Sequence, residues 1–181
     1  MSRYWDDDYE EDFPNQRALW QANADRALKG KRGRRALRDL REALLALPEP
    51  KLIEGALCSV NAARRIEELP GYGGGPDLAA KVERDGEGVC AIGALLWHRR
   101  VKAGVDPAEA FDSLPTLDDT NHDLDDTARL AVSDAGVVYS LAWRLACRND
   151  ETYRKMTPGE RHAAFLAWID TELADDAAGL S

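Results

Sequence analysis

Cysteine is scarce in this chain, and long apolar runs are missing. The three cysteines, Cys58, Cys90 and Cys147, are too few and too widely spaced for a disulfide framework or a zinc site. No apolar run approaches the roughly 20 residues that a membrane-spanning helix requires, and the first dozen residues are acidic, unlike a signal peptide. The sequence therefore predicts a soluble, cytoplasmic protein with no structural disulfide, no metal site and no membrane contact.

The motifs of common enzyme classes are missing as well. The chain has no phosphate-binding Walker loop, no GxSxG nucleophile motif, no HExxH zinc motif and no Cys-x-x-Cys pair. The glycine-rich stretch PGYGGGP, at 70–76, lacks the Lys-Ser/Thr that phosphate binding uses, and we expect it to be a loop tip. No cofactor is expected, and an enzyme is the less favoured interpretation.

What is present is sufficient for one packed domain. Hydrophobic residues make up 44% of the 181 positions. Segments with apolar residues at steps of three and four alternate with Pro and Gly breaks, and no convincing alternating strand occurs. We therefore predict an all-α domain of about six to eight helices, with a short β-hairpin at 83–90 as an alternative for that stretch. The domain is expected to span 15–174, between an acidic tail (1–14) and a frayed C-terminus (175–181).

The helix boundaries follow from breaks and capping residues. Helices are expected at 15–29, 34–47, 52–69, 90–103, 124–132 and 133–147, with a last one after 157. The patterns Asp106-Pro107 with Glu109, and Thr157-Pro158 with Glu160, are typical helix starts. Ser133 is expected to cap the helix that follows it.

Charge is unevenly distributed along the chain, whose net charge is -9. Residues 6–12 hold six acids in seven positions, whereas 26–41 hold eight basic residues against one acid, Asp39. The basic block is consistent with phosphate binding, with pairing to acids of the same protein, or with a solvated helix face. Internal pairing is favoured because the acidic tail is close in sequence and has a high effective concentration.

Two acidic stretches are candidates for partner binding. An aromatic residue in an acidic tail is typical of a short segment that docks on a partner; the alternative is a tail that folds back on the basic helix. The cluster at 112–126 does not have the spacing of a calcium loop; it is expected to be a solvated loop or, alternatively, a surface that imitates a phosphate backbone. The candidate partner-binding residues are Trp5, Asp6, Asp7, Asp8, Asp118 and Asp119.

A cysteine and a polar turn are the candidates for chemistry. Cys90 is placed at a helix N-terminus, where backbone amides favour a thiolate, but a buried small side chain is the favoured interpretation. The run Asn149-Asp150-Glu151 follows a helix end, where Asn149 suits a left-handed cap and nearby arginines suit ion pairs. A candidate ligand pocket would combine Lys31, Arg32, Cys90, Asn149, Asp150, Glu151 and Arg161.

The order of five sequence blocks resembles a family of small uncharacterised proteins from bacteriophages and prophages. The blocks are KRG (31–33), LPEPKLIEGAL (47–57), GEGVCAIGAL (86–95), RNDE (148–151) and TPGERHAAFLAWI (157–169). The acidic tail and the stretch at 59–82 look like additions to the family pattern. The resemblance implies a phage or prophage setting and no particular mechanism.

The preferred hypothesis is therefore a non-enzymatic phage or prophage accessory protein that binds a host or defence-system protein through acidic surfaces. It is expected to be a monomer or small homo-oligomer. Two alternatives remain open: a small-ligand-binding protein or thiol enzyme built on the candidate pocket, and a small virion structural component. Binding of nucleic acid is disfavoured because the body of the chain is acidic.

Overall fold

A computed structural model describes residues 14–53, 88–114, 124–153 and 155–178. The prediction of an all-α domain is confirmed: this part of the chain is helical and contains no strand. The helices are α2 (Pro14–Lys29), α3 (Lys31–Ala46), α6 (Ala91–Lys102), α7 (Pro107–Asp112), α8 (Leu124–Ala135), α9 (Tyr139–Cys147), the π-helix η1 (Arg148–Thr152) and α10 (Pro158–Ala178). Within these limits, no helix has the length and apolar character that a membrane crossing requires.

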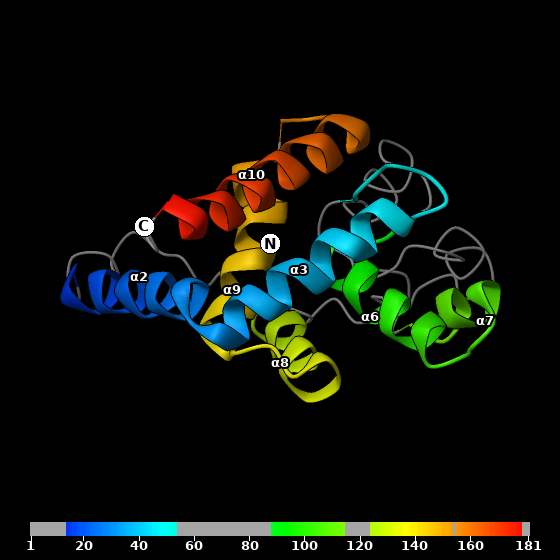
Figure 1. Cartoon of the computed structure of the whole chain (residues 1–181), viewed down its shortest axis with the longest axis horizontal. Helices are drawn as coiled ribbons and strands as arrows, with labels where there is room; N and C mark the ends of the chain where they lie inside the picture. The colour runs from blue at the N-terminus through cyan, green and yellow to red at the C-terminus, as the bar shows by residue number, and fades with distance from the viewer. Residues whose placement is uncertain (1–13, 54–87, 115–123, 154, 179–181) are drawn as a thin grey trace, which may run out of the picture.

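Helix α3 is the central element (Figure 1). It packs against α6 on one side and α10 on the other, while α2 packs on α9, and α8 and α9 contact each other. Of the α3 leucines that the helical spacing predicts to be buried, Leu37, Leu40 and Leu44 are buried, whereas Leu45 is 58% exposed. The largest fully buried apolar side chains are Leu37, Leu40, Leu44, Leu52, Ile92, Leu95, Leu141, Leu145, Phe165 and Ile169. Burying each such side chain stabilises the fold by roughly 1.5–3 kcal/mol before entropy is counted.

A close approach joins α2 and α3. Gly30 ends α2 and also serves as the extended N-cap of α3, so α3 begins at Lys31 instead of the expected residue 34. At Gly33, an added Cβ would lie 1.9 Å from Ala27 O. Only glycine allows the first turn of α3 to lie this close to the last turn of α2.

Both predicted capping patterns are confirmed. The Asp106 carboxylate accepts from the N–H of Ala108 (2.9 Å) and of Glu109 (3.3 Å) at the start of α7. At the start of α10, Thr157 N donates to Glu160 Oε2 (2.9 Å), and Glu160 N donates to Thr157 Oγ1 (3.3 Å), which is a reciprocal capping box.

Two boundary predictions are corrected. Ser133 is no cap, because its hydroxyl donates to Leu130 O (3.2 Å) and α8 continues to Ala135. The break comes instead at Gly136, whose φ of 56° is a left-handed conformation. At the C-terminus, α10 reaches Ala178, four residues beyond the expected boundary at 174.

The predicted helix at 52–69 and hairpin at 83–90 fall mostly outside the described residues. The two described residues of that helix, Leu52 and Ile53, are not helical. In the described part of the hairpin, Val89 O accepts a hydrogen bond from Ile53 N at 3.1 Å.

Candidate functional site

The non-helical residue Leu52 is held by the start of α10. Its N–H donates to Pro158 O (3.0 Å), and its carbonyl accepts from Arg161 Nη1 (2.7 Å). Arg161 Nη2 also donates to Met156 O (3.3 Å). Arg161 is fully buried, so carbonyl dipoles replace the water that its guanidinium would otherwise require.

The next residue, Ile53, is held by the buried amide of Asn149, which is 1% exposed. Asn149 Nδ2 donates to Ile53 O (2.8 Å) and to Asp150 Oδ1 (2.6 Å). Asn149 Oδ1 accepts from Ala91 N (3.3 Å), one of the amides at the N-terminus of α6. One side chain therefore links η1, α6 and the segment that follows α3.

These contacts form what we call the Leu52–Ile53 junction, whose residues are Leu52, Ile53, Val89, Asn149, Pro158 and Arg161. Four of the five sequence blocks meet there. Sequence analysis found the blocks separately, but it gave no sign that they converge, because the partners are up to 109 positions apart.

The expectation that Asn149 forms a left-handed cap is wrong. The chain does not stop at the end of α9 but continues as η1 through Thr152. The physical reason is that the Asn149 side chain points into the core, where its hydrogen bonds fix the backbone in the wider π turn.

Cys90 lies at the start of α6, as predicted, in a capping role. It is the N-cap residue, and its Sγ accepts from Gly93 N at 3.4 Å. The side chain is 5% exposed and belongs to the apolar core. The two described histidines are engaged elsewhere: His162 Nε2 lies 3.0 Å from Leu44 O, and His98 lies beside Glu42.

The structure brings together only part of the candidate pocket. Cys90, Asn149, Asp150 and Arg161 lie around the junction. Lys31 and Arg32 are exposed at the first turn of α3. They lie about 18 Å along the helix from Leu44, whose carbonyl contacts His162 of α10. The Glu151 side chain and all six candidate partner-binding residues (Trp5, Asp6, Asp7, Asp8, Asp118 and Asp119) lie outside the described part.

A shallow hollow opens beside the junction. Its volume is about 180 Å³, and its wall includes an ion pair between Lys51 Nζ and Glu49 Oε2 (2.6 Å). The lining residues are Leu47, Pro48, Glu49, Lys51, Gly88, Val89 and Phe111. Its small volume and mainly aliphatic wall offer few groups that would orient a ligand.

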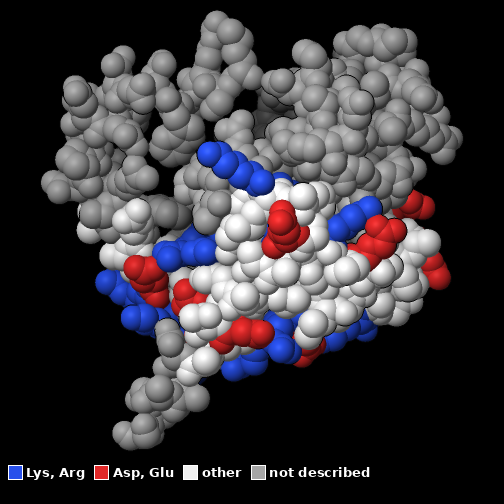
Figure 2. All heavy atoms as spheres, turned by 90° about the horizontal axis from the view of Figure 1, so that it is seen from above, with Lys and Arg blue, Asp and Glu red and all other residues white. Residues whose placement is uncertain are grey.

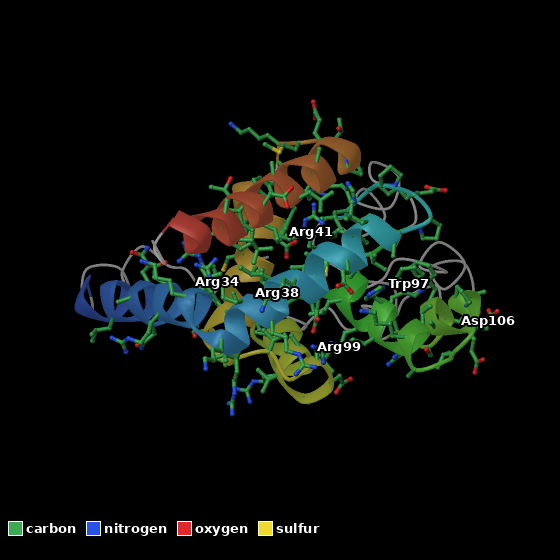
Figure 3. The ribbon with its side chains drawn as sticks, viewed as in Figure 1. Arg34, Arg38, Arg41, Trp97, Arg99 and Asp106 are labelled. Carbon is green, nitrogen blue, oxygen red and sulfur yellow. The ribbon has the colours of Figure 1, made fainter. Side chains whose placement is uncertain are left out.

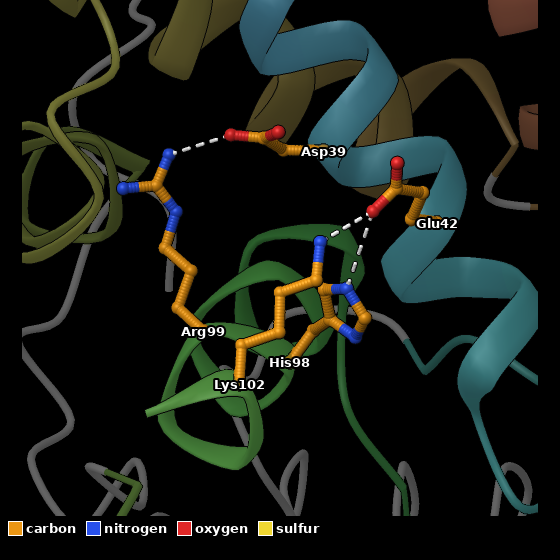
Figure 4. Close-up of polar contacts among 5 residues, drawn as sticks. All are labelled: Asp39, Glu42, His98, Arg99 and Lys102. Carbon is orange, nitrogen blue, oxygen red and sulfur yellow. Dashed lines mark hydrogen bonds and ion pairs between the residues drawn. The ribbon is translucent and has the colours of Figure 1, made fainter. Parts of the chain in front are cut away.

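A charge cluster that sequence analysis missed lies between α3 and α6 (Figure 4). Arg99 Nη2 lies 3.1 Å from Asp39 Oδ2, and Lys102 Nζ lies 2.5 Å from Glu42 Oε2. His98 Nε2 is 3.8 Å from the same Glu42 oxygen. The spacing of three residues within each helix places the acids on one face of α3 and the bases on one face of α6, but it does not identify the pairing.

Burial lowers the pKa of His98 below its ordinary value of 6.5, and the charge of Lys102 lowers it further. The carboxylates of Glu42 and Asp39 oppose this shift. The pKa of Glu42 is itself lowered by its hydrogen bond and attraction to Lys102. At neutral pH, His98 is therefore uncharged and Glu42 is ionised.

This arrangement predicts a pH dependence of stability. The unfolded chain binds a proton at residue 98 more readily than the folded chain, so the free energy of unfolding falls as the pH drops below about 6.5. We expect the His98→Gln variant to lose less stability than the wild type between about pH 7.5 and 5.5. The difference should be below about 1 kcal/mol, because the site is partly open to solvent. Urea unfolding of both proteins at the two pH values measures it, and equal losses would contradict the assignment.

The basic residues of α3 divide into two groups (Figure 3). Arg34 and Arg41 face α10: Arg34 donates to Glu172 O, and Arg41 Nε lies 2.6 Å from Asp170 Oδ1. The others, Lys31, Arg32, Arg35 and Arg38, are exposed. Figure 2, which looks down on α10, shows acids and bases interspersed over that face, with basic side chains along the lower edge, where α3 lies.

The described residues therefore differ in charge from the whole chain. They contain 18 Lys and Arg against 17 Asp and Glu, so most of the net charge of -9 comes from residues outside the described part. Among the described residues, no group of three or more His, Cys, Asp or Glu side chains is arranged to hold a metal ion. Comparison of the chain with protein-family models, with curated proteins and with solved structures finds no match.

Proposed function

We propose that the protein is a non-enzymatic accessory protein of a phage or prophage that acts by binding a host or defence-system protein. The supporting observation is the Leu52–Ile53 junction. The side chains best suited to chemistry, Cys90, Asn149 and Arg161, are buried there. Their described hydrogen bonds go to backbone groups, except for the one from Asn149 to Asp150 Oδ1. The phage setting rests on the order of the sequence blocks.

The thiol-enzyme alternative fits this arrangement less well. A nucleophilic cysteine needs an accessible sulfur and a nearby base. The Cys90 sulfur is enclosed in the core and accepts a hydrogen bond from Gly93 N, and His162 is directed at the carbonyl of Leu44. Binding of a partner protein needs neither an accessible thiol nor a base. It uses exposed surface, which remains available when these side chains are buried.

The test is affinity capture with the full chain from a lysate of the bacterial host, beside native mass spectrometry of the purified protein. We expect one host protein to be retained, and retention to fall with salt, because contacts through acidic segments are screened. A variant that lacks residues 1–13 and an Asp118→Asn/Asp119→Asn variant should each retain less of it. Glu109→Gln, an exposed acid on α7 outside both acidic stretches, is the matched control and should bind normally.

Two results would contradict the proposal. One is a co-purifying small molecule in the absence of any protein partner. The other is a partner whose retention is unchanged in both acidic-segment variants, because that result removes the acidic surfaces from the interface.

A further inference from the structure

One exposed stripe of α3 combines three cations with an apolar side chain. At 100° per residue, Lys31, Arg35, Arg38 and Leu45 fall within an arc of about 80°. All four side chains are exposed, and Leu45 is 58% exposed. We call these four residues the α3 ridge.

The ridge has no partner within the described part of the chain. The charges on either side of it are engaged: Arg41 pairs with Asp170 on α10, and Asp39 pairs with Arg99 of α6. No hydrogen bond or ion pair between described residues involves Lys31, Arg35 or Arg38. Glu42 falls within the same arc, but its carboxylate is paired with Lys102, so the stripe keeps three cations without a described partner.

Leu45 indicates which class of polyanion fits the ridge. The phosphate groups of a nucleic acid would be attracted to the cations, but an exposed leucine seven residues beyond Arg38 would add no binding energy to that contact. A protein segment would gain binding energy from both the cations and Leu45, because protein interfaces usually combine an apolar contact with charged contacts around it. The charge of the whole chain, -9, also repels nucleic acid at long range.

The chain's own acidic tail is too short to cover the ridge. Helix α2 has 16 residues and rises about 24 Å from Pro14 to the start of α3. The eight residues that separate Asp6 from Pro14 extend over at most about 27 Å. Arg38 lies about two turns farther along α3, which leads away from the start of α2 (Figure 1).

We propose that the α3 ridge docks an acidic segment of another protein, in which Asp or Glu side chains alternate with apolar ones. The carboxylates pair with Lys31, Arg35 and Arg38, and an apolar side chain packs on Leu45. The α3 ridge is separate from the acidic segments that are proposed to bind the host protein, so docking on it would be a further function. It can be tested with purified components alone.

The probe is a synthetic helical peptide of about 20 residues that carries Glu at steps of four and Leu on the same face. Its binding to the full chain is measured by fluorescence anisotropy at low salt, beside a DNA duplex of about 20 base pairs. The variants are Arg35→Glu/Arg38→Glu and Leu45→Gln. Lys155→Glu, an exposed cation before α10, is the control for a change of charge away from the ridge.

We expect the double charge reversal to weaken peptide binding at least tenfold and Leu45→Gln to weaken it several-fold, with Lys155→Glu unchanged. Thermal unfolding should be the same in all variants, because every altered side chain is exposed. Absence of peptide binding, equal binding by the ridge and control variants, or tighter binding of the duplex would each overturn the proposal. A gain of more than tenfold in peptide affinity when residues 1–13 are removed would also overturn it, because the chain's own tail would then occupy the ridge.

Discussion

Replacing Asn149 with leucine should lower the free energy of unfolding by about 3 kcal/mol. The substitution keeps a side chain of similar size but removes the acceptor for Ala91 N and the donor for Ile53 O. Each buried group left without a partner costs about 1–3 kcal/mol, whereas the change in packing volume is small. Urea unfolding followed by circular dichroism measures the loss.

Asn23→Leu is the matched control for this experiment. Asn23 is an exposed asparagine on α2 whose Oδ1 accepts a long hydrogen bond (3.4 Å) from Arg26. The same substitution there should change stability by no more than about 0.5 kcal/mol. If Asn149→Leu and Asn23→Leu were equally stable, Asn149 would have no special part in joining η1 to α6 and to Ile53.

Asn149→Asp separates the two halves of the interaction. The aspartate keeps an acceptor for Ala91 N but removes the donor to Ile53 O and places a second carboxylate beside Asp150. A buried carboxylate next to another acid is costly when ionised. This variant should therefore be destabilised most at neutral pH and recover stability as the pH falls, whereas Asn149→Leu should show no such recovery.

Local patterns were enough to predict most helices but not the site. The leucine spacing of α3 and the caps at Asp106 and Thr157 depend on neighbours within one or two turns. Both caps are confirmed, and the leucine stripe is buried at Leu37, Leu40 and Leu44 but not at Leu45. The Leu52–Ile53 junction depends on contacts across 96 and 109 positions. No periodicity along the chain reports such pairs.

The corrected predictions at Asn149 and Ser133 have different physical origins. Asn149 has the local preference of a helix cap, and Ser133 has that of an N-cap. Tertiary contacts override the preference at Asn149, because two buried backbone groups need its amide. At Ser133, a carbonyl of the preceding turn satisfies the hydroxyl, so the helix continues to the next residue that tolerates a left-handed conformation, Gly136.

The contact between α2 and α3 provides the second large expected effect. Gly33→Ala should lower the free energy of unfolding by about 2–3 kcal/mol, because its Cβ would lie 1.9 Å from Ala27 O and 2.8 Å from Ala27 C. Both atoms belong to the backbone, so a rotamer change cannot relieve the overlap. The two helices must instead move apart, which also shifts the neighbouring Arg34 and its hydrogen bond to Glu172 O on α10.

Gly30→Ala tests whether the cost at Gly33 arises from this overlap or from glycine's general flexibility. A Cβ at Gly30 would meet Ala27 O and Arg26 O at 3.5 Å, which is ordinary van der Waals contact, and the residue has a φ of -75° that alanine readily adopts. The loss of a favourable N-cap residue should cost less than about 1 kcal/mol. If flexibility alone mattered, the two variants would behave alike in urea unfolding. A loss at Gly33 at least twice that at Gly30 would instead identify the approach of the two helix backbones as the constraint that fixes how α3, and the ridge on its outer face, is presented.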